Sequence, residues 1–156
     1  MLNLLTPFST VPRRSSAYDA TANGGLGLIT GRWAVINSSG LATLPAAGVG
    51  GAYLVLEGNT QPDPTVTTTI GAGPAYLPAP LVSLPSSVAA GQVALAYGVF
   101  RYAVDIEGFD PASLIIGSPL QVDAVGRAAL LTGTNIRIGT VEGITTTNLI
   151  ARTTGE

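Results

Sequence analysis

The chain has 156 residues with 7 basic and 9 acidic side chains, which gives a formal net charge of −2. It contains neither Cys nor His, and every basic residue is Arg, so the thiol, imidazole and lysine chemistries of catalysis and zinc binding are excluded. With so few basic side chains to contact phosphates, we expect no nucleic-acid partner, and we predict a non-enzymatic protein without a cofactor or a metal site.

Glycine and proline are frequent, at 20 and 11 residues, and Val, Thr, Ile and Leu fill most of the segments between them. No segment shows a sustained apolar period of 3.6 residues, so the pattern predicts short strands separated by turns. We therefore predict an all-β protein with one compact domain over residues 31–156, either a β-barrel or a sandwich.

Residues 1–30 differ from the rest, because Pro7 and Pro12 fix extended backbone and Asn23-Gly24-Gly25 is a turn or hinge signal. This predicts an extended N-terminal arm, with a disordered terminus as the alternative. The apolar residues of this segment would be unusual in a solvated tail, and the arginine fork suits pairing with a partner's carboxylates. The arm residues that we predict to contact a partner are Leu5, Phe8, Val11, Arg13, Arg14 and Tyr18.

A regular pattern starts at Gly31. Residues 32–36 are typical of a strand, Asn37-Ser38-Ser39-Gly40 of a turn and residues 41–44 of the returning strand, which together predict a β-hairpin. After a glycine-rich loop, residues 52–56 are almost entirely apolar. They predict a central strand that is buried on both faces and ends at Glu57-Gly58.

The segment over residues 59–85 is rich in Pro, Thr and Gly and too long for an ordinary turn, so we expect an excursion with short strands such as residues 65–70. Five prolines interrupt the uncharged stretch over 64–100, which excludes a membrane-spanning helix there, and we expect no membrane partner. Residues 92–106 then predict one bent strand or a strand pair, with a bulge or bend at Gly98.

An internal repeat links the two ends of the domain. Residues 31–44, GRWAVINSSGLATL, align without gaps to residues 117–130, GSPLQVDAVGRAAL. An apolar strand ending in Glu-Gly comes after each copy at nearly the same distance, which gives two similar units over 31–58 and 117–143. Both copies predict hairpins, and a duplication and a shared hairpin sequence explain the match equally well.

One pair of carboxylates is a candidate for chemistry. Asp105 and Glu107 would share one face of a strand, as acid-base or glycosidase catalysis requires. A strand with one solvent-facing side predicts the same pattern, and we favour that interpretation. The acidic residues show none of the spacings that are typical of calcium loops.

The aromatic side chains are a second candidate group. They would form a carbohydrate-stacking platform or belong to the core, and we favour the core because they fall in predicted strands. The residues are Trp33, Tyr53, Tyr76, Tyr97, Phe100 and Tyr102.

The second hairpin and the segments C-terminal to it resemble a known family. The run IGSPLQVDAVGR over 116–127, the segment NIRIGTVEG over 135–143 and the strand over 148–153 are similar to the C-terminal half of the capsid-decorating (cement) proteins of tailed bacteriophages. In that family a hairpin of the form G-D-P-V-Y-x-D-x-x-G-K precedes x-x-I-G-x-A and a last strand V-x-V-R-L. Residues 31–44 look like the family's opening unit. This chain departs from the pattern at Ser118, in lacking Lys and in the proline-rich segment.

The resemblance implies a β-barrel or β-tulip-like domain, often a homotrimer, on the outer surface of an icosahedral phage head. There it would bind the major capsid protein and stabilise the contacts between capsid subunits, with the arm reaching across the lattice and adding strands to a neighbour. The protein would be made in the host cytoplasm and reside in the virion. The alternatives are a receptor-binding or glycan-binding β module on the virion surface and, in third place, a carboxylate hydrolase.

Overall fold

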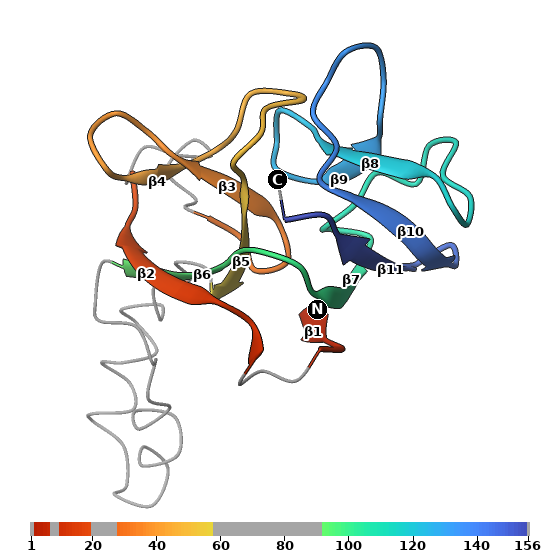
Figure 1. Ribbon diagram of the computed structural model, residues 1–156, viewed down its shortest axis with the longest axis horizontal. Helices are drawn as coiled ribbons and strands as arrows, with labels where there is room; N and C mark the ends of the chain where they lie inside the picture. The colour runs from red at the N-terminus through yellow and green to blue at the C-terminus, as the bar shows by residue number, and fades with distance from the viewer. Residues whose placement is uncertain (1, 7–9, 20–27, 58–91, 156) are drawn as a thin grey trace, which may run out of the picture.

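Two antiparallel β-sheets packed against one another make up the described part of the protein (Figure 1). The computed structural model describes residues 2–6, 10–19, 28–57 and 92–155, and within these ranges it contains eleven strands and no helix. Neither sheet of this described part closes into a barrel. The prediction of an all-β protein is therefore confirmed, in its sandwich form.

One sheet has five strands in the order β2-β6-β5-β3-β4. These are β2 (Arg13–Ala17), β3 (Trp33–Ile36), β4 (Ala42–Thr43), β5 (Tyr53–Glu57) and β6 (Gln92–Ala96). β5 lies at the centre, and its consecutive residues Leu54 and Val55 are both fully buried, one on each face of the sheet. The apolar run over 52–56 is thus a central strand, as predicted.

The other sheet has six strands in the order β1-β7-β11-β10-β8-β9. These are β1 (Leu2–Leu4), β7 (Arg101–Asp105), β8 (Pro119–Val122), β9 (Ala128–Leu130), β10 (Gly139–Ile144) and β11 (Asn148–Thr153). Gly98, with a φ of +85°, lies between β6 and β7, where the chain crosses from one sheet to the other. Residues 92–106 are therefore a strand pair with a bend at Gly98, one of the two predicted forms.

The five-stranded sheet and five strands of the six-stranded sheet have the same topology. Strands β2 to β6, which we call the first unit, correspond one by one to β7 to β11, the second unit, both in chain order and in position within the sheet. The first hairpin pairs Ile36 with Ala42, and the second pairs Val122 with Ala128. These are the residues that the sequence alignment matches, so both predicted hairpins are present in the same register.

An irregular feature of the central strands is repeated as well. β5 has a bulge between Val55 and Glu57 where it pairs with β6, and β10 has a bulge between Val141 and Gly143 where it pairs with β11. Glu57 therefore corresponds to Gly143, so the two Glu-Gly pairs of the sequence are not equivalent. A shared hairpin sequence does not account for this correspondence over five strands, which supports duplication of the whole unit.

Each unit also brings its two outer strands together. A single parallel bridge joins Tyr18 to Ala42 in the first unit, and a second one joins Phe109 to Ala128 in the other. The residue after each bridge forms an equivalent backbone hydrogen bond in the two units. The amide of Asp19 donates to the carbonyl of Ala42 at 2.8 Å, and the amide of Asp110 donates to the carbonyl of Ala128 at 2.8 Å. The sheets are thus strongly curled.

The units differ most between their last two strands. In the second unit a short turn joins β10 to β11, and the amide of Thr145 donates to the carbonyl of Asn148 at 2.8 Å. In the first unit the chain between β5 and β6 comprises residues 58–91, which lie outside the described residues. The predicted excursion over 59–85, with its strand at 65–70, falls in this segment.

The N-terminal segment contributes to both sheets. β1 pairs with β7, with Leu4 opposite Tyr102, and β2 pairs with β6 along its whole length. Val11, between these two strands, is buried in the core. For its described part, this corrects the prediction of an arm over 1–30 that extends away from the domain, because its apolar residues pack against the protein's own sheets. Asn23-Gly24-Gly25 lies outside the described residues.

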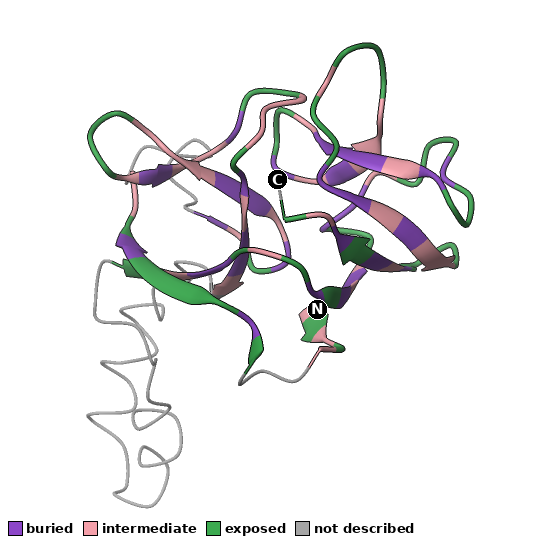
Figure 2. Cartoon of the chain, viewed as in Figure 1, coloured by how far each residue is buried: buried purple, intermediate pink, exposed green. Residues whose placement is uncertain are grey.

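The interior has two clusters of buried side chains. The larger one combines residues of both sheets, and the smaller one belongs to the first unit and contains Leu28, Ala34, Ala42, Val55, Val93 and Leu95. The equivalent positions of the second unit belong to the larger cluster and are Leu114, Leu120, Ala128, Val141, Leu149 and Ala151. Figure 2 shows these buried segments along the strands of both units, with exposed turns around them. Each unit therefore fills the same interior positions.

Candidate functional site

Two of the residues predicted to contact a partner lie near β1 or in the core. Leu5, just after β1, is 40% exposed and remains available to another molecule. Val11 is 4% exposed, because its side chain packs inside the protein, so it is not a contact residue. Phe8 lies outside the described residues.

The other three lie on or beside β2, at the edge of the five-stranded sheet. Arg13 and Arg14 are exposed, whereas Tyr18 is partly buried against the smaller cluster. The guanidinium carbon of Arg14 lies 5.6 Å from the ring centroid of Tyr53, a cation–π contact. Tyr53 in turn meets the edge of Tyr97, with 6.0 Å between the ring centroids. The strand β2 thus presents a basic surface with aromatic support.

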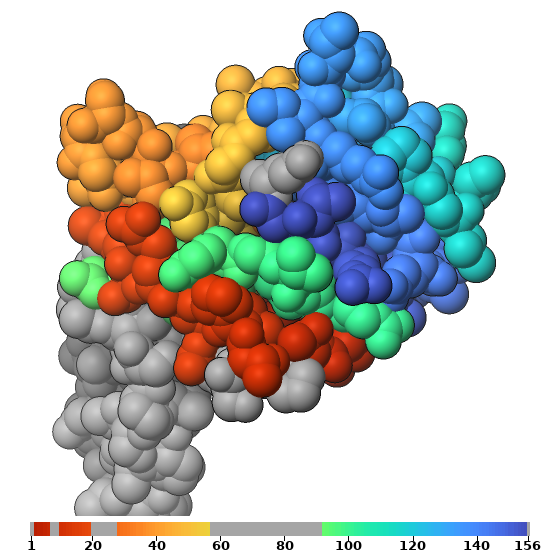
Figure 3. Space-filling model, in the orientation of Figure 1, coloured from red at the N-terminus to blue at the C-terminus, as the bar shows by residue number. Residues whose placement is uncertain are grey.

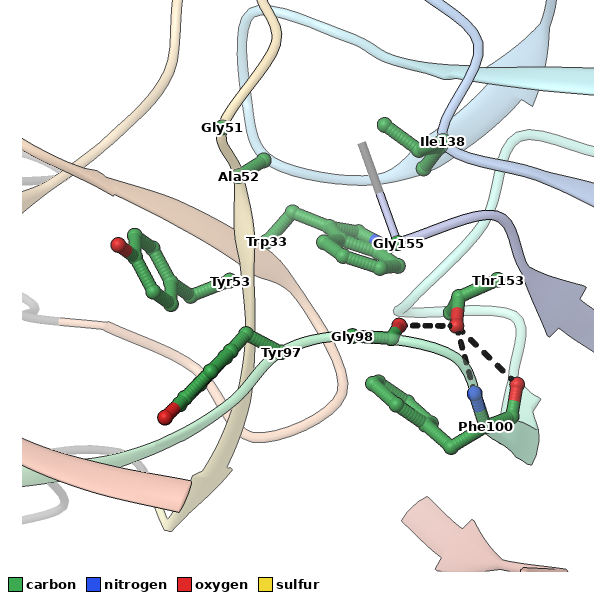
Figure 4. Close-up of a pocket in the computed structure, with 10 residues that line it drawn as sticks. All are labelled: Trp33, Gly51, Ala52, Tyr53, Tyr97, Gly98, Phe100, Ile138, Thr153 and Gly155. Carbon is green, nitrogen blue, oxygen red and sulfur yellow. Dashed lines mark hydrogen bonds between the residues drawn. The ribbon is translucent and has the colours of Figure 1, made fainter. Parts of the chain in front are cut away.

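A shallow pocket lies between the two units (Figure 4). It is lined by Trp33, Gly51, Ala52, Tyr53, Tyr97, Gly98, Phe100, Ile138, Thr153 and Gly155. The hydroxyl of Thr153 donates to the carbonyl of Gly98 at 2.6 Å and accepts a hydrogen bond from the amide of Phe100 at 2.8 Å, which fastens β11 to the bend between the units. The pocket volume of about 190 Å³ is smaller than that of typical ligand sites. The pocket therefore marks the junction of the units.

Trp33 belongs to the core, as predicted. Its side chain is 3% exposed and meets Tyr102 edge to face at a centroid distance of 5.9 Å. Phe100 is buried beside them, while Tyr53 is partly buried and Tyr97 is 44% exposed. A carbohydrate platform centred on Trp33 is thus not formed. The sixth aromatic, at position 76, lies outside the described residues.

Two polar atoms of this aromatic core have no hydrogen-bond partner within the described part of the chain. They are the indole Nε1 of Trp33 and the hydroxyl of Tyr102. Burial raises the pKa of the Tyr102 phenol above its ordinary range, and the nearby indole N–H of Trp33 offsets only part of that shift. The Tyr102 hydroxyl is therefore buried in its neutral form, and its desolvation is not compensated by a hydrogen bond of normal geometry.

We expect Tyr102→Phe to raise the free energy of unfolding by about 1 kcal/mol, because it removes a buried hydroxyl that lacks a partner. Urea titration followed by circular dichroism measures the change. Tyr53→Phe is the control and should leave the stability unchanged, since Tyr53 is only partly buried. A loss of stability in Tyr102→Phe would contradict the prediction and indicate a hydrogen bond to that hydroxyl.

The carboxylate pair predicted on one strand face is not formed. β7 ends at Asp105, and Glu107 lies in the next turn, whose Gly108 amide donates to the carbonyl of Asp105 at 2.9 Å. The backbone carbonyl of Glu107 accepts a hydrogen bond from Nε of Arg32 at 2.9 Å. The prediction placed both side chains on one strand. It is wrong for Glu107, because the strand ends at Asp105 and residues 106 and 107 belong to the turn. Among the described residues, no group of three or more acidic side chains is placed to hold a metal ion.

Of the large apolar side chains that the structure describes, Ile115 and Ile116 are the most exposed, at 69% and 68%. They lie in the loop between β7 and β8, which protrudes in teal at the right of the molecule (Figure 3). The amide of Ile115 donates to the hydroxyl of buried Ser118 at 3.0 Å, and the amide of Gly117 donates to the carbonyl of Val141 at 2.8 Å. We call this segment, residues 111–118, the isoleucine turn.

The backbone of the isoleucine turn is constrained at both ends. Ser113 has a φ of +61° and is the one non-glycine residue with positive φ within the described ranges, and Gly117 has a φ of +88°. Such conformations persist where the surrounding structure fixes them, and they concentrate at functional sites. The sequence analysis did not identify this site. The signal that could have found it is an apolar pair, Ile115 and Ile116, that lies before Gly117 and outside any predicted strand.

Comparison with protein-family models, with curated proteins and with solved structures finds no match to this chain. Within the part of the chain that the structure describes, no helix has the length and apolar character needed to cross a membrane.

Proposed function

We propose that this protein is a structural subunit of a larger protein assembly, and that it acts as a capsid decoration protein on the head of a tailed bacteriophage. It binds the outer surface of the head and stabilises the contacts between major capsid protein subunits. The observation that carries the proposal is the isoleucine turn, in which two apolar side chains are held out into solvent. An exposed apolar feature on a rigid backbone is typical of a protein-binding surface.

The position of this turn agrees with the family resemblance. Ile116 is the first residue of the run over 116–127 that is similar to decoration proteins, and this run contains β8 and the turn of the β8–β9 hairpin. The apolar anchors therefore directly precede the hairpin that carries the resemblance. The proposal includes a homotrimer as the oligomeric state, and mass photometry of the purified protein distinguishes it from a monomer.

The double variant Ile115→Asp/Ile116→Asp is expected to weaken binding to expanded phage heads by at least about 30-fold, since a single central apolar anchor contributes about 2 kcal/mol or more. Cosedimentation with heads over a range of protein concentrations measures the affinity. The circular dichroism spectrum should not change, because both side chains are exposed.

Ile136→Asp is the matched control for this experiment. Ile136 is 45% exposed in a different loop, so the change in charge per site is the same. If the control binds normally and the double variant does not, the isoleucine turn is the contact. Wild-type affinity in the double variant would refute its role.

A glycan-binding module is the second candidate, and it now rests on two of the six aromatic residues that the sequence suggested, without Trp33. The pair of partly buried Tyr53 and exposed Tyr97, with Arg14 against Tyr53, has the aromatic faces that sugars stack upon. Trp33 is too deeply buried to take part. A glycan array with wild-type protein and Tyr97→Ala separates this function from the capsid-binding one.

A further inference from the structure

The duplication gives the protein two equivalent sheet edges, and among the described residues only one of them is covered by a further strand. In the second unit, the outer edge of β7 is covered by β1, with Leu2 opposite Val104, Asn3 opposite Ala103 and Leu4 opposite Tyr102. In the first unit, the strand equivalent to β7 is β2, which is the last strand of its sheet. Figure 2 shows β2 as mostly exposed. Within the described residues, the first unit thus has the acceptor edge without the added strand.

The backbone of β2 has the polarity needed to accept a strand. The amide of Tyr97 donates to the carbonyl of Pro12 at 3.1 Å. Along an antiparallel pair, every second residue is hydrogen-bonded to the partner strand and the residues between point their backbone groups away from it. This alternation directs the N–H and C=O of Ser15 away from β6. In the second unit the equivalent of Ser15 is Ala103, which faces Asn3 of β1. Ser15 therefore directs its backbone N–H and C=O outward, as Ala103 does at the edge of β7 that already binds β1.

The side chains of the two edges call for different partners. Where β7 presents buried Tyr102 to Leu4, β2 presents Arg14, the equivalent residue, exposed to solvent. Among the described residues, Arg101 forms an ion pair with Glu142, and Arg127 forms ion pairs with Asp110 and Asp123. Arg14 forms no such ion pair with a described residue, and its guanidinium lies over the Tyr53 ring. A strand added to β2 would therefore place a carboxylate, rather than a leucine, opposite Arg14.

We propose that the edge of β2 (Arg13–Ala17) accepts an extended segment of another protein as an antiparallel strand, with an acidic residue opposite Arg14. The bridge from Tyr18 to Ala42 begins only after β2, and the equivalent bridge of the second unit coexists with β1. Main-chain hydrogen bonds at Ser15 supply the affinity, and the Arg14 pair selects the register. This deepens the proposed function, on which it rests in one respect: the segment belongs to a capsid subunit.

The first test measures binding of expanded heads to Arg14→Glu. Reversal of this charge is expected to reduce affinity about tenfold or more, because it places like charges across the added strand. Arg152→Glu is the matched control, since it makes the same charge change at an exposed position of β11. Normal head binding by Arg14→Glu would overturn the proposal and leave the decoration function intact.

The second test does not depend on heads. A synthetic peptide of residues 2–6 carrying Leu4→Glu is titrated into ¹⁵N-labelled protein at millimolar concentration. The amide signal of Ser15 should shift in a saturable manner in wild type and in Arg152→Glu, but not in Arg14→Glu. If wild-type protein binds no heads, the decoration function fails, and this titration alone decides the edge proposal. Without a shift at Ser15, the β2 edge is not a strand acceptor.

Discussion

Replacing Trp33 with alanine is expected to lower the free energy of unfolding by about 3–5 kcal/mol, the usual cost of deleting a large buried aromatic side chain. The indole is 3% exposed, packs edge to face on Tyr102 and lies where the two units meet. Its removal would leave a cavity between two sheets, and neither sheet can shift into it without breaking strand pairs. Urea or thermal unfolding followed by circular dichroism measures the loss.

Tyr97→Ala is the control for this experiment. Tyr97 lines the same pocket but is 44% exposed, so its truncation should cost less than about 1 kcal/mol. A stable, folded Trp33→Ala protein that loses binding on a glycan array would contradict the core assignment and restore the carbohydrate platform. A protein that is unfolded or strongly destabilised, with the control intact, confirms that Trp33 joins the units.

The parts of the fold that sequence reasoning predicted are those with local signals. Each hairpin carries its own turn chemistry. In the second turn, Oδ1 of Asp123 accepts hydrogen bonds from the amides of Val125 and Arg127 at 3.0 and 2.8 Å. In the first turn, Asn37 accepts equivalent bonds from Ser39 and Leu41 at 2.9 and 3.0 Å. Such turns can be predicted from the sequence because the residues that fix them are close together in it.

The N-terminal strands were misjudged because their partners are distant in the sequence. Arg14 pairs with Leu95, and Leu4 pairs with Tyr102, which no local pattern reveals. β2 is an edge strand with four exposed residues out of five, so its sequence looks like a solvated segment. A deletion of residues 1–25 would remove two strands and a core valine, and it is therefore not a clean test of capsid binding.

The candidate sites show the same division. Burial of Trp33 was predicted from its place in a strand, whereas the exposure of Ile115 and Ile116 depends on a turn that is fastened to Ser118 and Val141. The special role of Arg14 depends on a comparison between two edges of the same molecule. Neither property is encoded by the residue types alone, since each arises from what the rest of the fold places beside them.

Gly126→Ala is expected to lower the free energy of unfolding by about 2–5 kcal/mol, through a strained backbone conformation and a steric clash. Gly126 has a φ of +82°, and a methyl group there would lie 2.5 Å from the carbonyl oxygen of Trp33. The carbonyl of Gly126 also accepts a hydrogen bond from the amide of Trp33 at 2.6 Å. Because this contact joins the second unit to the first, the clash is expected to loosen their packing.

The duplication supplies the matched control, Gly40→Ala. Gly40 is the equivalent turn residue of the first unit, with a φ of +79°, but a methyl group there meets no atom within 4 Å. Its substitution should cost only the backbone term, about 1–2 kcal/mol. Since the two positions share their turn and differ in what lies against them, the difference in unfolding free energy measures the packing between the units. Equal losses in the two variants would mean that the second hairpin does not rest on Trp33.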